Sequence, residues 1–226
     1  MKKLIIWDFD GVIADTEKLW IQVWRDTLKE QRNFVLTPQQ EFEILVGVAD
    51  KDKRERLEKY FPNLNLDADF MQKITDGEIY MGTHFMKAIP GVEAIFADTR
   101  FAHCIATGAT KIQHAWKMTQ LDWIENYMSK ADFFTSDMVP HGKPAPDLFL
   151  LAAKTENYPH QNCIVIGDSL NDFAAAKAAG IDCIAFVGAE GNNTSAYRQK
   201  CMDAGVLTVC ATMNELHRFL SDWLQK

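Results

Sequence analysis

Short apolar runs recur along the chain, and polar or turn-forming residues bound each of them. The first run stops at Asp8, and five more follow after residue 100, of which the last is the weakest. Runs this short and this apolar are typical of strands that are buried on both faces of a sheet. We therefore expect strands at Lys3–Trp7, Phe101–Ala106, Asp132–Thr135, Cys163–Ile166, Cys183–Val187 and Leu207–Cys210.

Helix-like stretches separate these strands from residue 101 to the end of the chain. In one of them an alanine-rich segment runs into Gly180, which is typical of a glycine that ends a helix. Regular alternation of strand and helix predicts βα units and a parallel sheet covered by helices on both faces. The expected helices are Lys111–Leu121, Asp147–Lys154, Leu170–Ala179, Thr194–Asp203 and Met213–Leu224.

Residues 16–86 break this alternation. They are rich in charge, carry apolar side chains at helical spacing, and contain a Thr37-Pro38 helix start but no convincing strand. Pro90-Gly91 then marks the return to the strand–helix pattern. We expect one α/β domain built from residues 1–15 and 87–226, with a helical insert at residues 16–86.

Composition and charge narrow the class of protein. The 226 residues are 47% hydrophobic and carry a net charge of -7, which makes nucleic acid and anionic membranes poor partners. The five cysteines are scattered without a CxxC pair, as in reduced proteins. The apolar run behind Met1 stops at Asp8, too early for a secretory signal, and no run is long enough to span a membrane. We expect a cytoplasmic protein and, by default, a monomer.

Four polar clusters follow the expected strands. They are Asp8-Phe9-Asp10-Gly11, Thr107-Gly108, Gly142-Lys143-Pro144 and the segment 167–172, whose sequence is Gly-Asp-Ser-Leu-Asn-Asp. Each alone could be ordinary turn chemistry, since Asp and Gly commonly follow strands. Open α/β sheets, however, bind their ligands at the carboxyl ends of strands, so four clusters in this order predict one site.

The residue types in these clusters suit phosphoryl transfer. Several carboxylates brought together repel one another, and a hard cation such as Mg²⁺ relieves that repulsion. One carboxylate can attack phosphorus, and a second acid two residues later can donate a proton to the leaving oxygen. The hydroxyl of Thr107, the backbone amides of Gly108 and Ala109, and the ammonium of Lys143 can hold the phosphoryl oxygens.

The same clusters resemble the four motifs of the haloacid dehalogenase-like hydrolase superfamily. The segment 8–17 resembles the first motif, and the clusters at Thr107, Lys143 and 167–172 resemble the others in order. The resemblance implies a Rossmann-like, doubly wound parallel core and a helical cap inserted after the first motif. Members of this kind include sugar-phosphate phosphatases, phosphoglycolate phosphatases and β-phosphoglucomutase.

The resemblance also implies a role for each position. Asp8 would be nucleophile and metal ligand, while Asp10 would be general acid/base and offer its backbone carbonyl to Mg²⁺. Asp168 would be the other carboxylate ligand, and Asp172 an acid behind the ligands. Thr107, Gly108 and Lys143 would bind the phosphoryl group. The implied reaction is Mg²⁺-dependent hydrolysis of a small phosphorylated metabolite, such as a sugar phosphate, through an aspartyl-phosphate.

Three alternatives belong to the same fold. Asp10 makes a dehalogenase improbable, because the dehalogenating branch lacks this acid. A β-phosphoglucomutase-like phosphotransferase is the second. The mutases, however, carry a histidine where this chain has Trp20 and Lys-Gly-x-x-Arg where it has Val46-Gly47-Val48-Ala49-Asp50. A binding module without activity is the third, and the intact set of motif residues argues against it.

The insert is expected to determine the substrate. Its candidates for contact with the leaving group are Glu17, Trp20, Gly47 and Lys51. Trp20 could equally pack between helices of the insert, and Lys51 lies in a mixed run of charges that could simply face water. Gly47 could equally end a helix.

Overall fold

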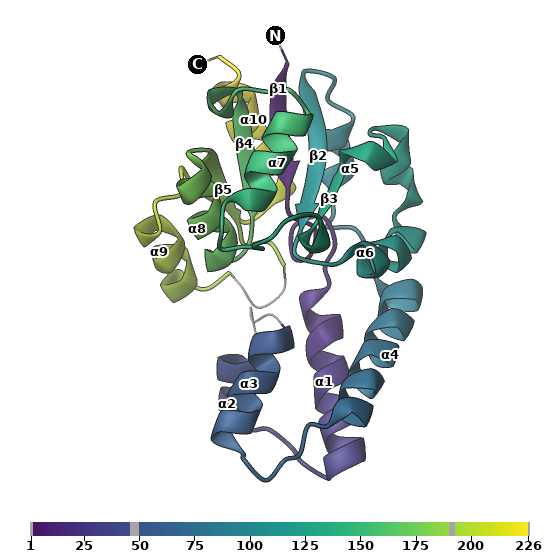
Figure 1. Cartoon of the computed structure of the whole chain (residues 1–226). Helices are drawn as coiled ribbons and strands as arrows, with labels where there is room; N and C mark the ends of the chain where they lie inside the picture. Colours follow the sequence, from purple (N-terminus) through teal and green to yellow (C-terminus); the bar gives the residue numbers. More distant parts are fainter. Residues whose placement is uncertain (1, 46–49, 190–192, 226) are drawn as a thin grey trace. The chain divides into compact units, whose positions relative to one another are not determined.

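The computed structural model describes residues 2–45, 50–189 and 193–225, and it divides into two compact units (Figure 1). The core unit comprises residues 1–15 and 87–226, and the helical unit comprises residues 16–86. The chain leaves and re-enters the core unit through adjacent backbone: Asp15 N donates to Lys87 O at 3.0 Å, and Ala14 forms an antiparallel bridge with Ala88.

The core unit is built on a six-stranded parallel sheet with the strand order β3-β2-β1-β4-β5-β6. The first strand, β1, lies at the centre, where the chain order reverses, and open sheets of this kind bind ligands at that crevice. The prediction of a parallel α/β sheet is confirmed, with strand ends within about two residues of those expected. The strands are β1 Lys3–Trp7, β2 Phe101–Thr107, β3 Phe133–Thr135, β4 Cys163–Gly167, β5 Asp182–Phe186 and β6 Val209–Cys210.

Helices cover both faces of this sheet. Helix α7 lies in front of it in Figure 1 and contacts β1, β2 and β3, whereas α10 lies behind and contacts β6 and α5. Short 3₁₀ segments at 118–120, 122–126, 130–132, 136–138 and 160–162 fill the connections. The α-helices are α5 Val92–Phe96, α6 Lys111–Lys117, α7 Asp147–Thr155, α8 Leu170–Ala179, α9 Ser195–Asp203 and α10 Met213–Trp223.

Two helices begin with capping boxes directly after the strands that carry the polar clusters. Thr110 and Gln113 cap α6 reciprocally, and Ser169 and Asp172 do the same for α8. Such caps satisfy backbone N–H groups that have no partner inside the helix. Gly180 ends α8 in the left-handed conformation, at φ 66°, as the sequence predicts.

The helical unit has a hydrophobic core of its own. Thr37 and Gln40 form a capping box at the start of α2, as the Thr37-Pro38 signal predicts. Within the described residues of this unit, 16–45 and 50–86, the structure contains no strand. None of the described helices is both long and apolar enough to cross a membrane. The helices are α1 Glu17–Arg32, α2 Pro38–Ile44, α3 Asp50–Tyr60 and α4 Ala68–Phe85, and the core residues are Val23, Trp24, Leu28, Leu36, Ile44, Leu45, Leu57, Leu64, Leu66, Phe70 and Ile74.

Two histidines are buried in the core unit. Trp7 Nε1 donates to His103 Nδ1 at 3.2 Å, and the His114 ring packs against Phe9 and Phe133. Burial lowers the pKa of each imidazole to about 4, because the charged ring would lose its hydration. Both rings are therefore neutral in the folded protein near neutral pH.

This burial makes stability depend on pH. An unfolded histidine has a pKa of about 6.5, so each neutral ring stabilises the fold above that pH and loses its contribution as the pH falls toward 4. Between pH 7.5 and pH 5 the free energy of unfolding falls in the wild type because of this histidine. In His114→Leu we expect that fall to be smaller by about 2 kcal/mol. Urea unfolding at both pH values measures this. His160→Gln replaces an exposed ring and should keep the wild-type slope, whereas an unchanged slope in His114→Leu would contradict the account.

Candidate active site

The predicted core residues meet at the carboxyl edge of the sheet. Asp8 directly follows β1, and its backbone N–H continues the ladder to Ile166 O at 2.8 Å. Asp168 directly follows β4, and Thr107 is the last residue of β2. Because β2, β1 and β4 are neighbours, three distant parts of the sequence are brought to one point.

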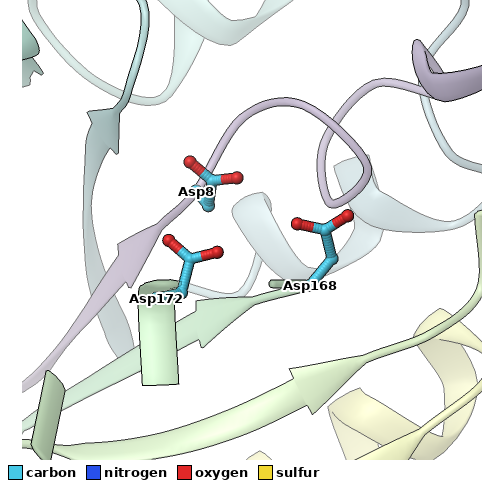
Figure 2. Close-up of side chains that lie close together, drawn as sticks. All are labelled: Asp8, Asp168 and Asp172. Carbon is cyan, nitrogen blue, oxygen red and sulfur yellow. The ribbon is translucent and has the colours of Figure 1, made fainter. Parts of the chain in front are cut away.

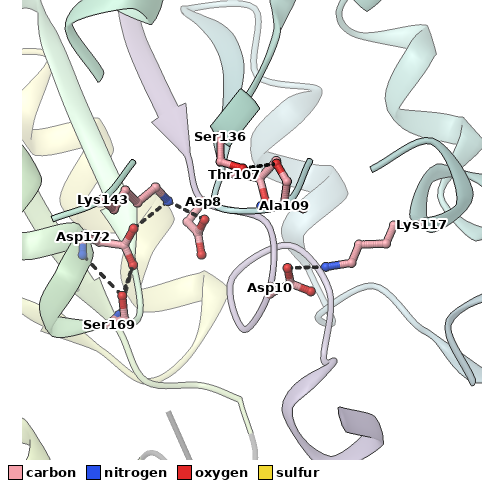
Figure 3. Close-up of polar contacts among 9 residues, drawn as sticks. All are labelled: Asp8, Asp10, Thr107, Ala109, Lys117, Ser136, Lys143, Ser169 and Asp172. Atoms are coloured by element: carbon pink, nitrogen blue, oxygen red, sulfur yellow. Dashed lines mark hydrogen bonds and ion pairs between the residues drawn. The ribbon is translucent and has the colours of Figure 1, made fainter. Parts of the chain in front are cut away.

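A buried ion-paired trio occupies this point (Figure 3). Lys143 Nζ donates to Asp8 Oδ1 and to Asp172 Oδ1, each at 2.6 Å. The three side chains are at most 10% exposed. One ammonium thus fixes both carboxylates, and charges buried this deeply are tolerated only when they are paired.

Burial and pairing act in opposite directions on these groups. Burial alone would lower the pKa of Lys143, but the carboxylates of Asp172 and Asp8 raise it above its ordinary value, so the lysine stays charged. Burial raises the pKa of Asp8 to about 7, although Lys143 acts to lower it. A second cation beside Asp8 would favour its ionised form.

The start of α8 holds the third member of the trio in place. Ser169 Oγ donates to Asp172 Oδ2 at 2.5 Å, and Ser169 N donates to the same oxygen at 3.2 Å. A Cβ on Gly167 would lie 2.5 Å from the Asp172 Cβ, so only glycine leaves room for this side chain. Both oxygens of Asp172 therefore have protein donors, one from Lys143 and one from Ser169.

Three carboxylates form a possible metal site (Figure 2). One oxygen from each of Asp8, Asp168 and Asp172 lies within 4.8 Å of the others. Together with the single ammonium of Lys143, they leave two negative charges, which one divalent cation balances. An all-oxygen donor set of this charge fits Mg²⁺.

Asp168 is held from two sides. Tyr197, in α9, donates its hydroxyl to the backbone carbonyl of Asp168 at 2.5 Å. On the other side, Gly11 has φ +75°, and a Cβ there would lie 2.2 Å from Asp168 Oδ2. The first motif and the last motif are thus in direct contact through a glycine and a carboxylate.

The Asp10 carboxylate lies apart from this cluster. It is paired with Lys117, whose Nζ donates to Asp10 Oδ2 at 2.5 Å (Figure 3). The family resemblance implies that Asp10 contributes its backbone carbonyl to the metal and its carboxyl group to proton transfer. A carboxylate directed away from the three acids is compatible with both predicted roles.

The loop after β2 carries the predicted phosphate donors. Thr107 is buried, and its Oγ1 accepts the backbone N–H of Ala109 at 3.1 Å. Gly108 is exposed, and a Cβ added to it would meet no heavy atom within 4 Å. Ser136, which follows β3, donates its backbone N–H to Ala109 O at 2.9 Å and fixes the loop from the other side.

The four candidates for substrate contact lie in the insert. Glu17 is the first residue of α1 and is partly exposed, and Trp20 lies one turn further on and is buried. Lys51 is in the first turn of α3, but its side chain is outside the described part of the structure, as is all of Gly47. Their roles remain predictions from the sequence.

Comparison with known proteins decides the family. The family model described as "Haloacid dehalogenase-like hydrolase" matches residues 5–186. The chain belongs to this family. The predicted resemblance is confirmed, and with it the Rossmann-like α/β fold.

Individual relatives agree with this assignment. The Phosphorylated carbohydrates phosphatase of Thermotoga maritima is 27% identical over 183 residues, which cover 80% of this chain and 82% of the relative. The Fructose-1-phosphate phosphatase YqaB of Escherichia coli is 26% identical over 196 residues, 80% of this chain and 94% of the relative. A conserved haloacid dehalogenase-like protein of Agrobacterium tumefaciens has the same fold, with a TM-score of 0.85, 24% identity, and coverage of 98% and 99%.

The sequence does not point to every residue at this edge. Lys117 lies inside an expected helix and belongs to no motif, and Tyr197 and Ser136 are equally ordinary in sequence. A lysine on a helix is usually a solvated side chain, so only the folded structure brings Lys117 to Asp10. Ser169 lies inside the last motif, and its spacing to Asp172 is the signal of a capping box.

Proposed function

We propose that this protein is a Mg²⁺-dependent phosphatase that hydrolyses a small phosphorylated metabolite, such as a sugar phosphate, through an aspartyl-phosphate on Asp8. The observation that supports it most is the buried trio of Asp8, Lys143 and Asp172, with Asp168 beside it. The trio supplies an oriented carboxylate and a fixed cation, and Asp168 adds a further oxygen donor for a metal at the topological switch point.

The class of enzyme follows from the family and from its named relatives. The chain is a phosphoric monoester hydrolase of the haloacid dehalogenase-like superfamily, to which relatives named as phosphatases belong. Two of these relatives are named for phosphorylated carbohydrates and for fructose 1-phosphate. A phosphorylated sugar is accordingly the substrate class we propose, without a choice among its members.

In the first step Asp8 is the nucleophile. A lone pair of its carboxylate forms the new P–O bond while the bond from phosphorus to the leaving oxygen breaks. Asp10, as a carboxylic acid, gives its proton to that oxygen, which departs as an alcohol. Lys143 and the β2 loop at Thr107 hold the charge that collects on the phosphoryl oxygens.

In the second step Asp10 acts as a base. It takes a proton from water as the water oxygen attacks phosphorus, and the bond from phosphorus to Asp8 breaks. Inorganic phosphate is released, and Asp10 is again an acid. Both proton transfers use the same carboxyl group, so its position matters in each half of the reaction.

Asp8, Asp168 and the Asp10 backbone carbonyl would hold Mg²⁺, with Asp172 behind them. When bound, the cation would stabilise the negative charge on the phosphoryl oxygens and orient the phosphoryl group for attack by Asp8. Asp172 contributes indirectly, because it shares Lys143 with Asp8.

The direct test is hydrolysis of p-nitrophenyl phosphate with and without Mg²⁺. We expect removal of the metal by EDTA to lower kcat/KM by about 100-fold, because the three carboxylates then repel the dianionic ester without compensation. Added Mg²⁺ should restore the rate. Turnover that is absent, or that is equal with and without metal, would contradict the proposal.

Mutase activity is separated from hydrolysis by a second assay. With β-glucose 1-phosphate, a phosphatase releases inorganic phosphate, whereas a mutase accumulates glucose 6-phosphate. We propose the first outcome. We also propose a monomeric state and a cytoplasmic location. The location is supported by the five cysteines, which are all free and buried, as expected in a reducing compartment.

A further inference from the structure

We propose that Lys117 is a positioning residue for Asp10, holding the acid/base carboxylate in place for both proton transfers. This inference rests on the proposed function, because it concerns the acid that the proposed reaction uses twice. Lys117 lies outside the four motifs, and its sequence context assigns it no role.

The site contains two separate ion-paired groups (Figure 3). On one side, Lys143 pairs with the nucleophile and with Asp172. On the other, Lys117 pairs with Asp10 at 2.5 Å. Each acid that the mechanism needs thus has its own ammonium, and Asp10 is drawn away from the cluster that would bind the metal.

The two members of the Lys117–Asp10 ion pair differ in how far they are buried. The Lys117 side chain is 8% exposed, whereas that of Asp10 is 31% exposed. An ammonium gives up most of its hydration at such a position, and a close carboxylate offsets that cost. The Asp10 carboxylate, in contrast, keeps access to solvent and hence to a leaving group or a water molecule.

The surroundings of Lys117 fix its direction. Its Nζ lies 5.9 Å from the centre of the Phe9 ring and 5.7 Å from that of Trp116. His114, one turn earlier on α6, is buried and neutral near pH 7, since burial lowers its pKa to about 4. The ammonium therefore lies near two aromatic rings, and one of them belongs to Phe9, the residue that joins Asp8 to Asp10.

Helix α6 connects this pair to the phosphate loop. The helix begins at Lys111, a few residues after Thr107, and its capping box fixes its first turn. Lys117 is its last residue, so a short rigid helix links the predicted phosphoryl donor to the position of the acid. A displacement at one end of this helix would therefore displace the residues at its other end.

Lys117→Met tests the inference with p-nitrophenyl phosphate. The side chain keeps its length and its packing against the rings but loses its charge. Because p-nitrophenolate leaves without a proton, formation of the aspartyl-phosphate should stay fast, whereas its hydrolysis needs Asp10 to activate water. We expect kcat to fall about 20-fold with KM unchanged or lower, and a burst of p-nitrophenolate equal to the enzyme concentration.

Three variants accompany it. Lys117→Arg retains the charge and should recover part of the rate. Lys154→Met makes the same change on an exposed lysine of α7 and should behave as wild type. Asp10→Asn should abolish the second step, and the double variant with Lys117→Met should be no slower than Asp10→Asn alone if Lys117 acts through Asp10.

Two outcomes for the Lys117→Met variants would contradict the proposed positioning role. Wild-type kcat in a folded Lys117→Met protein, or losses that add in the double variant, would overturn the role of Lys117. These outcomes are distinct from failure of the proposed function, in which the wild type itself shows no metal-dependent hydrolysis. If Lys117→Met does not fold, Lys117→Gln removes the charge but keeps a polar end group, and a wild-type kcat without a burst in that folded variant would likewise overturn the role of the Lys117–Asp10 pair.

Discussion

Replacement of Asp8 by asparagine is expected to lower kcat by about 10⁴-fold or more while the protein remains folded. The amide cannot form the aspartyl-phosphate, so both steps of the proposed reaction are lost. The fold should tolerate the change, because burial already disfavours the charge on Asp8 by raising its pKa to about 7. Lys143 keeps Asp172 as its partner at 2.6 Å.

Two measurements check this result. Steady-state hydrolysis of p-nitrophenyl phosphate gives the loss in kcat, and thermal unfolding followed by circular dichroism shows whether the fold is intact. Acid quenching of the wild type during turnover should trap a phosphorylated protein, and the Asp8→Asn protein should give none. A folded variant with kcat within tenfold of wild type would remove Asp8 from the role of nucleophile.

Replacement of Gly11 by alanine is expected to lower kcat/KM by about 10³-fold at limiting Mg²⁺. The new Cβ would lie 2.2 Å from Asp168 Oδ2, closer than any real contact, so the carboxylate or the turn must move. Displacement of Asp168, a proposed ligand, would weaken metal binding and would also shift Asp10 and Asp8, which directly precede the same turn. Titration calorimetry with Mg²⁺ should show the weaker binding without reference to activity.

Gly180→Ala is the matched control for this variant. Gly180 has φ +66°, close to the φ +75° of Gly11, but no atom lies within 4 Å of the added Cβ. It therefore carries the same backbone strain, about 1–2 kcal/mol, without the clash. Gly180→Ala should be less stable yet bind Mg²⁺ normally. Equal metal affinities in the two variants would show that strain, and not contact with Asp168, limits position 11.

Most of the core could be predicted because its signals are local. A strand buried on both faces must be apolar throughout, so runs such as Lys3–Trp7 are visible in the sequence with their ends. The same holds for Leu170–Ala179, where a cap and a glycine mark both ends of α8. The pattern does not predict the five-residue helix α5, since one turn carries too little periodicity to distinguish it from a loop.

The candidate site could be predicted only as far as its motifs reach. Asp8, Lys143 and Asp172 lie in motifs, and the structure brings them together, although their chemical roles remain proposals. The pairing of Lys117 with Asp10 joins residues 107 positions apart, and no local pattern encodes it. Long-range partners of this kind depend on where helices pack, which the sequence of either segment alone does not determine.

The backbone that joins the two units has an evolutionary consequence. The two ends of the insert join the core at residues that are neighbours in space. The backbone of Asp15 is hydrogen-bonded to that of Lys87, and Ala14 forms a β-bridge with Ala88. Closing a segment whose ends already meet costs the host little entropy, almost regardless of the segment's length. A lineage could therefore lengthen, shorten or exchange residues 16–86 and acquire a new substrate while its inherited chemistry stayed intact.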